Sequence, residues 1–487
     1  MITTTFIIPK LDYVLMNGLI PSTRLKQVDL LIRHLIHKDC KSTAVPVDSF
    51  YTHWADGGFS IPNLVERSKL MQIKLFCMLK TSPDDNTRKL FNRFIQEEMV
   101  FRKVLTDPMV QRFEHILEKD NKMLQSSNRK TCCIFGRAFK ASASLDIGVQ
   151  ISNDSEHVIS IKDMRKPNDE AIECADHQKV NIIISKILRE RHKLLLYALP
   201  MRGHSFKTLE KSKCSNAFII NPRKLMNNKV QQFCIAGRAN CLPTKEVIHF
   251  EKPMNNKICP RCNRGMETLH HILNNCRPGS LCAYKSRHDE VVSATVDLIK
   301  ETFKPYPSIH LSKSINLEGL HLDGNLSRLL PDIWFKDPVS NKVYIIEVTV
   351  PYGLYSDDGT ASLDKRRNEK INKYSPLVAE VAKQLNIIVS FHVIVVSSLG
   401  CVTRETYEEL KRINSYRKVV RRTAIRYSEA ALGSSCKIFW SALHPTDSVT
   451  IDPLANSDSF SDHTQPDDPL SDTSHEGHVA SDTLDIL

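Results

Sequence analysis

The chain has 487 residues, of which 41% are hydrophobic and 25% charged, a composition that suits a folded protein of about two to four domains and excludes collagen-like or wholly disordered chains. No apolar run approaches the roughly 18 residues that a membrane span requires, and Lys10 and Asp12 interrupt the apolar opening segment, so we expect neither a membrane anchor nor a signal peptide. The net charge is +12. This value understates the basic character of the preceding residues, because residues 438–487 hold ten acids and no Lys or Arg. The part of the chain before residue 438 therefore favours polyanions such as nucleic acids.

Residues 1–125 are predicted to form a helical domain. Apolar residues recur there three and four positions apart, which is the spacing of one helix face. Three stretches have this pattern: 23–38, 65–80 and 87–105. Between the first two, Asp56-Gly57-Gly58 predicts a turn, because glycine adopts positive φ without a steric penalty. Pro62 is expected in the first turn of the next helix.

Residues 126–255 are predicted to be a connector that ends in a helical linker. Its first part, up to residue 180, is polar and mixed, and its hydrophobic periodicity is weak. We expect a helix after it at 180–199. A second helix is expected within residues 229–247, and it should end near Pro243 because proline cannot continue a helix.

One tight cluster stands out among the 14 cysteines, which we expect to be thiols of a reducing compartment because no secretory signal is found. Its members, within 256–285, are Cys259, Cys262, His271 and Cys276. Their spacing, C-x2-C-x8-H-x4-C, predicts a CCHC zinc knuckle with a structural role, because four such ligands close a tetrahedral zinc site. Using His270 gives x7 and x5 instead. The helical face favours His271, but the choice stays open.

Residues 286–443 are predicted to form an α/β domain. An amphipathic helix at 287–303 comes first. Two β-branched and aromatic runs then flank a turn composition, which predicts a hairpin. The runs lie at 329–335 and 342–350, and a basic helix (363–385), a strand (387–398) and further helices follow. This order describes an α/β unit. The tail at 444–487, rich in Ser, Asp, Thr and Pro, is predicted to be disordered and acidic.

Two carboxylates of the hairpin are the candidate catalytic metal ligands. Asp332 follows Pro331 at the start of the first predicted strand, and Glu347 lies in the middle of the second, between Ile346 and Val348. An acid among apolar neighbours is unfavourable unless it is paired or bound to a metal. Phosphodiester hydrolysis needs a metal held by carboxylates. The pair therefore predicts a Mg²⁺ site.

A lysine near these acids would steady the charge that develops on the phosphate. Thr349 stands two residues after Glu347, so the lysine must come from another element. Lys370 is the predicted one, with Tyr374 one turn away on the same face of the basic helix. Lys373 is the alternative.

Six motifs follow one another along this half of the chain: CPRC, TLHHILNNC, Arg287-His288, LLPDIWF, IIEVTV and EKINKY. Their order resembles the C-terminal part of non-LTR retrotransposon polyproteins that carry a restriction-enzyme-like endonuclease, including elements that insert into ribosomal RNA genes. The resemblance implies a zinc knuckle followed by a PD-(D/E)xK-type nuclease whose lysine has moved to a helix.

The resemblance also implies roles for particular residues. Asp332 and Glu347 would be metal ligands. Lys370 would be the catalytic lysine and Tyr374 its neighbour. Two residues before the hairpin would be DNA or RNA contacts: Arg287 and His288.

Earlier segments resemble the same polyproteins. Residues 7–36 and 53–64 look like the thumb that follows the polymerase palm, and 238–247 looks like the linker. The aromatic-x-Asp-Asp strand of a palm is missing from the sequence, since Asp84-Asp85 follow Pro83 in a polar turn. We therefore expect a truncated copy, or a partial gene model, of a longer protein, without reverse transcriptase activity.

The sequence thus predicts a multidomain α plus α/β protein that acts as a nuclear, Mg²⁺-dependent endonuclease. It would nick target DNA to leave a 3′ hydroxyl that primes reverse transcription, with the element RNA as a second partner. One rival is a catalytically inactive nucleic-acid-binding remnant or domesticated fragment, which need not bind Mg²⁺. Another is a structural zinc protein that binds a protein partner, against which salt-dependent DNA binding would argue.

Overall fold

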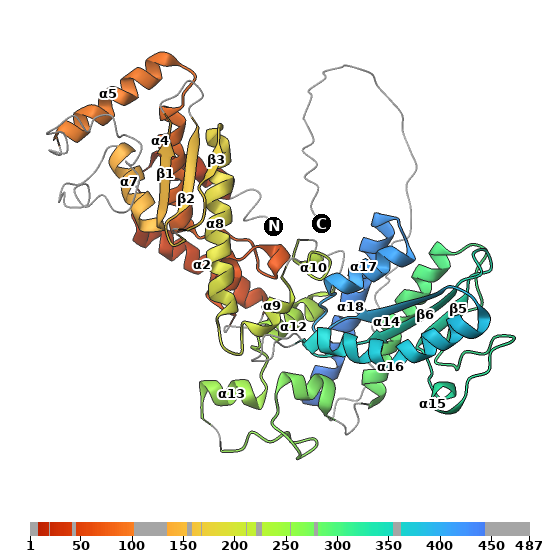
Figure 1. Cartoon of the computed structure of the whole chain (residues 1–487). Helices are drawn as coiled ribbons and strands as arrows, with labels where there is room; N and C mark the ends of the chain where they lie inside the picture. The colour runs from red at the N-terminus through yellow and green to blue at the C-terminus, as the bar shows by residue number, and fades with distance from the viewer. Residues whose placement is uncertain are drawn as a thin grey trace, which may run out of the picture. The chain divides into compact units, whose positions relative to one another are not determined.

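Helices and two small sheets make up the described part of the structure, a computed structural model (Figure 1). The described residues are 8–18, 20–40, 45–101, 134–152, 158–166, 168–210, 212–220, 226–253, 255–276, 281–353 and 362–443. Met1–Leu443 group into one unit. The acidic tail that we predict to be disordered lies outside the described residues.

The N-terminal part is helical, as predicted. Its helices are α1 (Ile8–Asn17), α2 (Ser22–Cys40), α3 (Val47–Tyr51), α4 (Leu64–Lys80) and α5 (Asp85–Phe101). The buried side chains of α4, among them Leu70, Ile73 and Phe76, lie in one apolar core with residues of α1, α7 and α8. Asn63 caps α4 by accepting two backbone N–H hydrogen bonds. Pro62 therefore lies before the cap, and its predicted place in the first turn is wrong.

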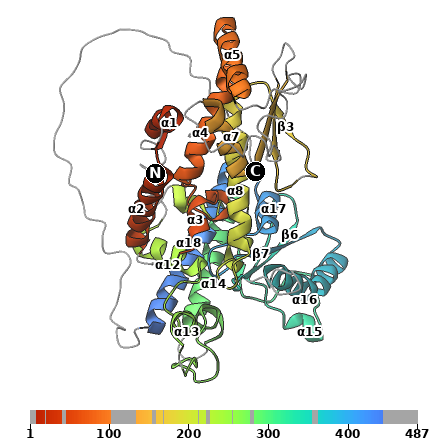
Figure 2. The same cartoon turned by 90° about the vertical axis from the view of Figure 1, so that its left-hand side faces the viewer.

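Residues 134–174, in the first part of the predicted connector, contain regular structure that the weak periodicity of the sequence does not indicate. They form helix α7 (Ile134–Leu145) and an antiparallel sheet of β1 (Ile147–Ile151), β2 (Ile159–Asp163) and β3 (Ile172–Cys174). Apolar side chains of β1 and β2, such as Val149 and Ile161, share the core of α4. Helix α8 (His177–Tyr197), which is predicted correctly, packs beside this sheet and α4, as two views show (Figures 1 and 2).

The segment between α8 and the cysteine cluster is built from short helices: α9 (His204–Thr208), α10 (Ala217–Ile220), α12 (Asn228–Arg238) and α13 (Lys245–Glu251). Arg238 at the end of α12 is 2% exposed, and its guanidinium donates to Asn216 Oδ1 and to two carbonyl oxygens, those of Ser215 and Leu399. Asn216 in turn donates to Ala55 O. These bonds join the N-terminal helices, the linker and the C-terminal part.

The C-terminal part contains the second sheet, whose strands lie in the order β4-β5-β6-β7. The strands are β4 (His310–Leu311), β5 (Ile333–Lys336), β6 (Val343–Thr349) and β7 (Val389–Val395). β5 and β6 form the predicted antiparallel hairpin, and β7 pairs in parallel with β6. The helices around them are α14 (Leu281–Thr302), α15 (Gly324–Ser327), α16 (Ser362–Leu385), α17 (Arg404–Ile413) and α18 (Arg417–Leu443).

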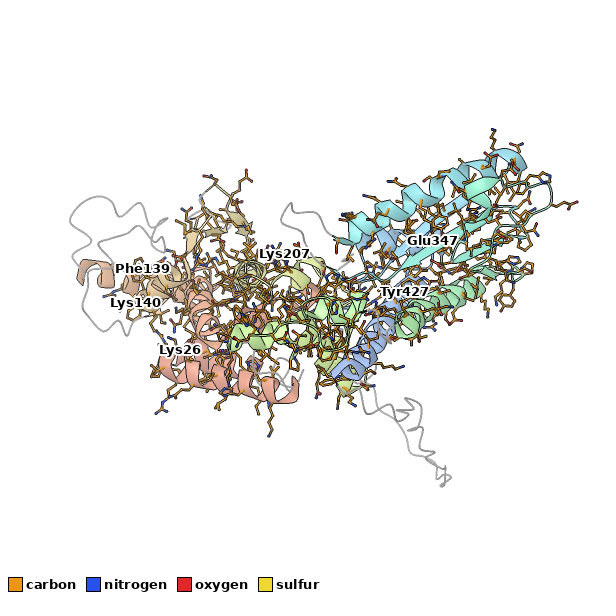
Figure 3. The ribbon with its side chains drawn as sticks, turned by 90° about the horizontal axis from the view of Figure 1, so that it is seen from below. Lys26, Phe139, Lys140, Lys207, Glu347 and Tyr427 are labelled. Carbon is orange, nitrogen blue, oxygen red and sulfur yellow. The ribbon has the colours of Figure 1, made fainter. Side chains whose placement is uncertain are left out.

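Helices cover both faces of this sheet. Ile345 and Val343 pack against Leu377 of α16, whereas Ile346 and Val348 belong to a core with residues of α14 and α18. Seen from below, the sheet lies between these two helical layers (Figure 3). Alternate residues of β6 thus face opposite layers, and each buried aliphatic side chain contributes about 1.5–3 kcal/mol. No described helix is long and apolar enough to cross a membrane.

Candidate functional site

The predicted cysteine cluster forms a four-ligand group. The ligand atoms of its members all lie within 4.8 Å of one another: Cys259, Cys262, His271 and Cys276. The first two stand on a tight turn, in which Cys259 N donates to Gly265 O and Asn263 has a φ of 51°. His271 is the first residue of a π-helical turn, η5 (His271–Asn275), and Cys276 directly follows this turn. Three thiols and one imidazole at this spacing could bind a metal such as zinc.

The structure also decides between the two histidines. His271 Nε2 lies 3.2 Å from Cys262 Sγ, whereas His270 stacks on Tyr352, with ring centroids 4.9 Å apart. The backbone N–H of Arg264 lowers the pKa of the Cys262 thiol, which favours the thiolate that metals bind. His271, not His270, belongs to the cluster.

The strand register brings the two predicted acids together. Ile333 of β5 pairs with Ile346 of β6, so the preceding Asp332 lies opposite Glu347. The backbone N–H of Asp332 donates to Glu347 Oε1 at 3.1 Å, and the N–H of Val348 donates to Asp332 Oδ2 at 2.7 Å. Glu347 is 0% exposed and is labelled within the sheet in Figure 3. Two carboxylates are thus fixed by backbone donors at one point of the hairpin.

Helix α16 supplies the cation. Lys370 Nζ lies 2.7 Å from Glu347 Oε2, so the predicted lysine reaches the acids. Lys373 Nζ lies instead over the ring of Tyr374, 4.8 Å from its centroid. Tyr374 is 2% exposed and donates from its hydroxyl to Leu330 O at 3.2 Å, which fixes α16 next to the start of β5. Lys370 rather than Lys373 therefore contacts the carboxylates.

The two acids have opposite electrostatic settings. Burial, and then the charge of Asp332, raise the pKa of Glu347, although Lys370 opposes them. Burial also acts to raise the pKa of Asp332, but hydrogen bonds from His288 and from the N–H of Val348 outweigh it, and the net pKa is lowered. The charge of Lys370 therefore favours the ionised form of Glu347 against burial, while the hydrogen bonds to Asp332 stabilise its anion.

The two predicted nucleic-acid contacts on α14 have different positions. Arg287 is 2% exposed, and its guanidinium donates to Ser435 Oγ of α18 and lies 5.5 Å from the ring centroid of Tyr284. Its predicted role as a DNA or RNA contact is wrong for this structure, because the side chain joins two packed helices. His288 turns instead to the acids: its Nε2 lies 3.4 Å from Asp332 Oδ2.

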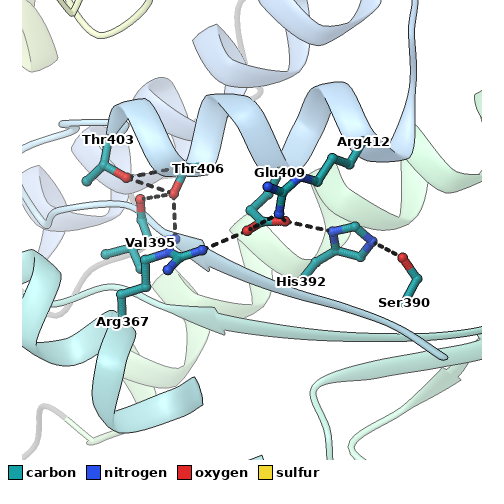
Figure 4. Close-up of polar contacts among 8 residues, drawn as sticks. All are labelled: Arg367, Ser390, His392, Val395, Thr403, Thr406, Glu409 and Arg412. Carbon is teal, nitrogen blue, oxygen red and sulfur yellow. Dashed lines mark hydrogen bonds and ion pairs between the residues drawn. The ribbon is translucent and has the colours of Figure 1, made fainter. Parts of the chain in front are cut away.

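A buried polar network that we do not predict from the sequence fixes α16 to the sheet (Figure 4). Glu409 of α17 accepts from Arg367 at 2.7 Å and from His392 Nδ1 of β7 at 2.9 Å. Ser390, His392 and Glu409 have the hydrogen-bond order of a nucleophile, base and acid. However, His392 is 2% exposed, and Glu409 also pairs with Arg412, so we assign the network a structural role.

The network includes one member of the basic run Lys365-Arg366-Arg367. The ion pair of Arg367 with Glu409 makes this side chain a brace of α16. It stands three residues before Lys370, so the brace holds the helix turn that carries the lysine. The neighbouring Arg366 pairs with Glu369. Of this run, Lys365 is exposed and stays a candidate for a phosphate contact.

The cysteine cluster and the acids are structurally connected. Asn274 of η5 donates from Nδ2 to Val350 O, directly after β6, at 3.1 Å. Tyr284 near the start of α14 donates to the carbonyl oxygens of Ile272 and Cys276. The cluster thus supports both the strand that carries Glu347 and the helix that carries His288.

Comparison of the sequence with models of known protein families finds no match, and comparison with curated proteins finds none either. What the two sites could do chemically therefore has to be inferred from their own residues. One is a group of three thiols and an imidazole, and the other is a buried pair of acids with a lysine and a histidine.

Proposed function

We propose that the chain is a metal-dependent endonuclease that nicks DNA at the site formed by Asp332, Glu347 and Lys370. The observation that supports this proposal is the convergence of the three side chains from β5, β6 and α16. Glu347 accepts a hydrogen bond from the backbone N–H of Asp332, and Asp332 accepts one from the N–H of Val348. Lys370 Nζ lies 2.7 Å from Glu347 Oε2. Two acids that could hold a metal, with a lysine beside them, are a set suited to metal-assisted phosphodiester cleavage.

The donor set suits a hard divalent cation. Carboxylate oxygens are the ligands that Mg²⁺ prefers, and Asp332 and Glu347 provide them from two adjacent strands. The negative charge of Asp332 next to Glu347 is electrostatically unfavourable, and a bound cation would relieve this repulsion. When bound, Mg²⁺ would polarise the phosphate and lower the pKa of the attacking water.

Lys370 would contribute positive charge at the phosphate, and the other residues hold it in position. The side chain of Lys370 is 29% exposed, so its ammonium group is placed to contact a phosphate oxygen of the substrate and stabilise negative charge that develops there. Tyr374 holds its helix against Leu330 O, and the Glu409 network holds the preceding turn through Arg367. Neither the tyrosine nor the network needs to contact the substrate.

We propose that the Cys/His cluster binds zinc and acts structurally, since four protein ligands leave no open position. The resemblance of the motifs supports a DNA target, the element RNA as partner, the nucleus as location and target-primed reverse transcription as the process. Exposed cations of α16 and α18 are candidate phosphate contacts: Lys365, Lys418 and Arg421. A catalytically inactive remnant stays the alternative.

A nicking assay on supercoiled plasmid tests the proposal. We expect the zinc-loaded full chain to convert the plasmid to open circles with Mg²⁺ or Mn²⁺, and not without added divalent ions. Asp332→Asn keeps the shape of the side chain and should abolish nicking. The matched control is Asp323→Asn, an exposed acid of the same part of the chain whose side chain makes no capping hydrogen bond. Salt-sensitive DNA binding should persist in both variants, because Lys and Arg contacts dominate affinity.

Equal nicking by the wild type and Asp332→Asn would refute the assignment of the site. DNA binding without any divalent-ion binding at the acids would favour the inactive remnant.

A further inference from the structure

We infer that His288 is a third metal ligand of the acidic site, which gives that site a nitrogen donor and a preference for first-row transition ions over Mg²⁺ and Ca²⁺. This inference rests on the proposed function, because it assumes a cation at Asp332 and Glu347. It replaces the expectation that His288 contacts nucleic acid.

The geometry around the imidazole carries the inference. His288 Nε2 lies 3.2 Å from the carbonyl oxygen of Val348 and 3.4 Å from Asp332 Oδ2. These two oxygens come from β6 and from the residue before β5, so Nε2 lies near one oxygen from each strand of the hairpin. Adjacent ligands of a six-coordinate ion with bonds near 2.1 Å lie about 3 Å apart, close to the spacing seen here.

The other ring nitrogen is oriented in the way that metal-binding histidines require. His288 Nδ1 lies 3.2 Å from Asp289 Oδ1, and a carboxylate in this position holds a proton on Nδ1, so Nε2 is the nitrogen that can bind a cation once its own proton has left. A cation that binds here takes the place of the Nε2 proton, which leaves to solvent. His288 is also 27% exposed, so the point is accessible to an ion from solvent.

The backbone of α14 keeps the imidazole in place. The preceding residue, Arg287, is buried against Ser435, so the helix cannot rotate His288 away without exposing a guanidinium that packs on Tyr284. The histidine is thus held next to the carboxylates by its neighbour. Imidazole favours transition ions, whereas carboxylates and carbonyls alone suit Mg²⁺ and Ca²⁺. A mixed set with His288 therefore shifts the metal preference of the site.

Mn²⁺ binding to the zinc-loaded full chain, followed by electron paramagnetic resonance, tests this inference. Pulsed spectra detect the ¹⁴N nucleus of an imidazole bound directly to Mn²⁺. We expect this coupling in the wild type, and its loss in His288→Gln, with Mn²⁺ affinity about tenfold weaker or more. Mg²⁺ affinity, measured by competition, should fall less. His321→Gln is the control, because His321 is exposed in the same part of the chain. It should leave coupling and affinity unchanged.

The outcomes separate this inference from the proposed function. One outcome is that the wild type binds Mn²⁺ without ¹⁴N coupling and that Asp332→Asn loses this Mn²⁺. That outcome would overturn the role of His288 and leave the acidic metal site standing. A coupling that persists in His288→Gln would overturn it as well. No Mn²⁺ bound by the wild type would overturn both. His288→Ala, checked for folding by circular dichroism, repeats the test without the amide of glutamine.

Discussion

Replacing Lys370 by methionine should destabilise the protein in a manner that depends on pH. Glu347 is 0% exposed, and Lys370 Nζ is 2.7 Å from its Oε2. Removing one partner of a buried pair costs about 3–5 kcal/mol. Lys370 is 29% exposed, so solvent screens part of the interaction, and we expect about 2 kcal/mol. A loss of 2 kcal/mol lowers Tm by about 4–8 °C in a domain of about 150–250 residues, so the shift should be smaller in the larger unit Met1–Leu443.

The pH dependence follows from the pKa of Glu347. Burial raises this pKa above its unfolded value, so the associated stability is present at low pH and is lost as pH rises through the folded pKa. Without Lys370 the pKa rises further. The difference in Tm between the wild type and Lys370→Met should therefore be largest at neutral pH and shrink as the solution is acidified, because protonated Glu347 needs no cation.

Thermal unfolding followed by circular dichroism, in buffer without divalent ions, measures this difference. Chelators must be left out, since they would also remove metal from the cysteine cluster. Lys373→Met is the matched control, because Lys373 lies over the Tyr374 ring and not against the acids. Equal destabilisation by both substitutions, or a loss for Lys370→Met that does not change with pH, would refute the electrostatic reasoning.

Three further predictions concern other parts of the chain. Cys276→Ser should lose the one bound zinc that we expect per chain, measured by metal analysis, and should lose order around the cluster; full zinc retention would contradict the ligand assignment. Arg287→Met should leave DNA affinity at matched salt within about twofold, since the side chain is 2% exposed, whereas a large loss would restore its role as a contact. Burial acts to lower the pKa of His192, but hydrogen bonds to Asp48 and Glu66 outweigh it and raise this pKa to about 9. His192 should therefore stabilise the fold fully below pH 6.5 and lose that contribution as pH rises to about 9. In His192→Gln this loss of Tm should disappear; a slope equal to that of the wild type would show that other groups cause it.

Long periodic elements were predictable from the sequence. The stretches at 65–80, 180–199 and 363–385 match α4, α8 and α16 within a few residues, because an apolar face repeats along each of them. The small sheet at 147–174 was not predictable. β3 is three residues long with two exposed positions, so it carries no alternating pattern of its own. Its pairing depends on β2, which is a contact between segments and not a local property.

The candidate site, too, was only partly predictable from the sequence. Spacing alone indicated the cysteine cluster and the two acids, since each set stands within one local motif. The choice of Lys370 over Lys373 depends on how α16 lies across β6, and the turn of His288 towards Asp332 depends on how α14 lies beneath the hairpin. The burial of Arg287 requires Ser435, which is 148 residues away in sequence. A signal that could have indicated His288 is its place next to Arg287 on an amphipathic helix, where the two side chains point to different layers.

The cysteine cluster is not a detachable module, although its spacing suggests one. Leu269, Ile272 and Leu273 are at most 1% exposed and share one core with Leu432 and Phe439 of α18. A fragment that begins at residue 286 would expose this side of α18 and forfeit about 1.5–3 kcal/mol for each lost aliphatic side chain. A C-terminal fragment meant for expression should therefore begin before α12, whose Phe233 lies in the same core. Any fusion of another domain to this part of the chain would have to respect the same boundary.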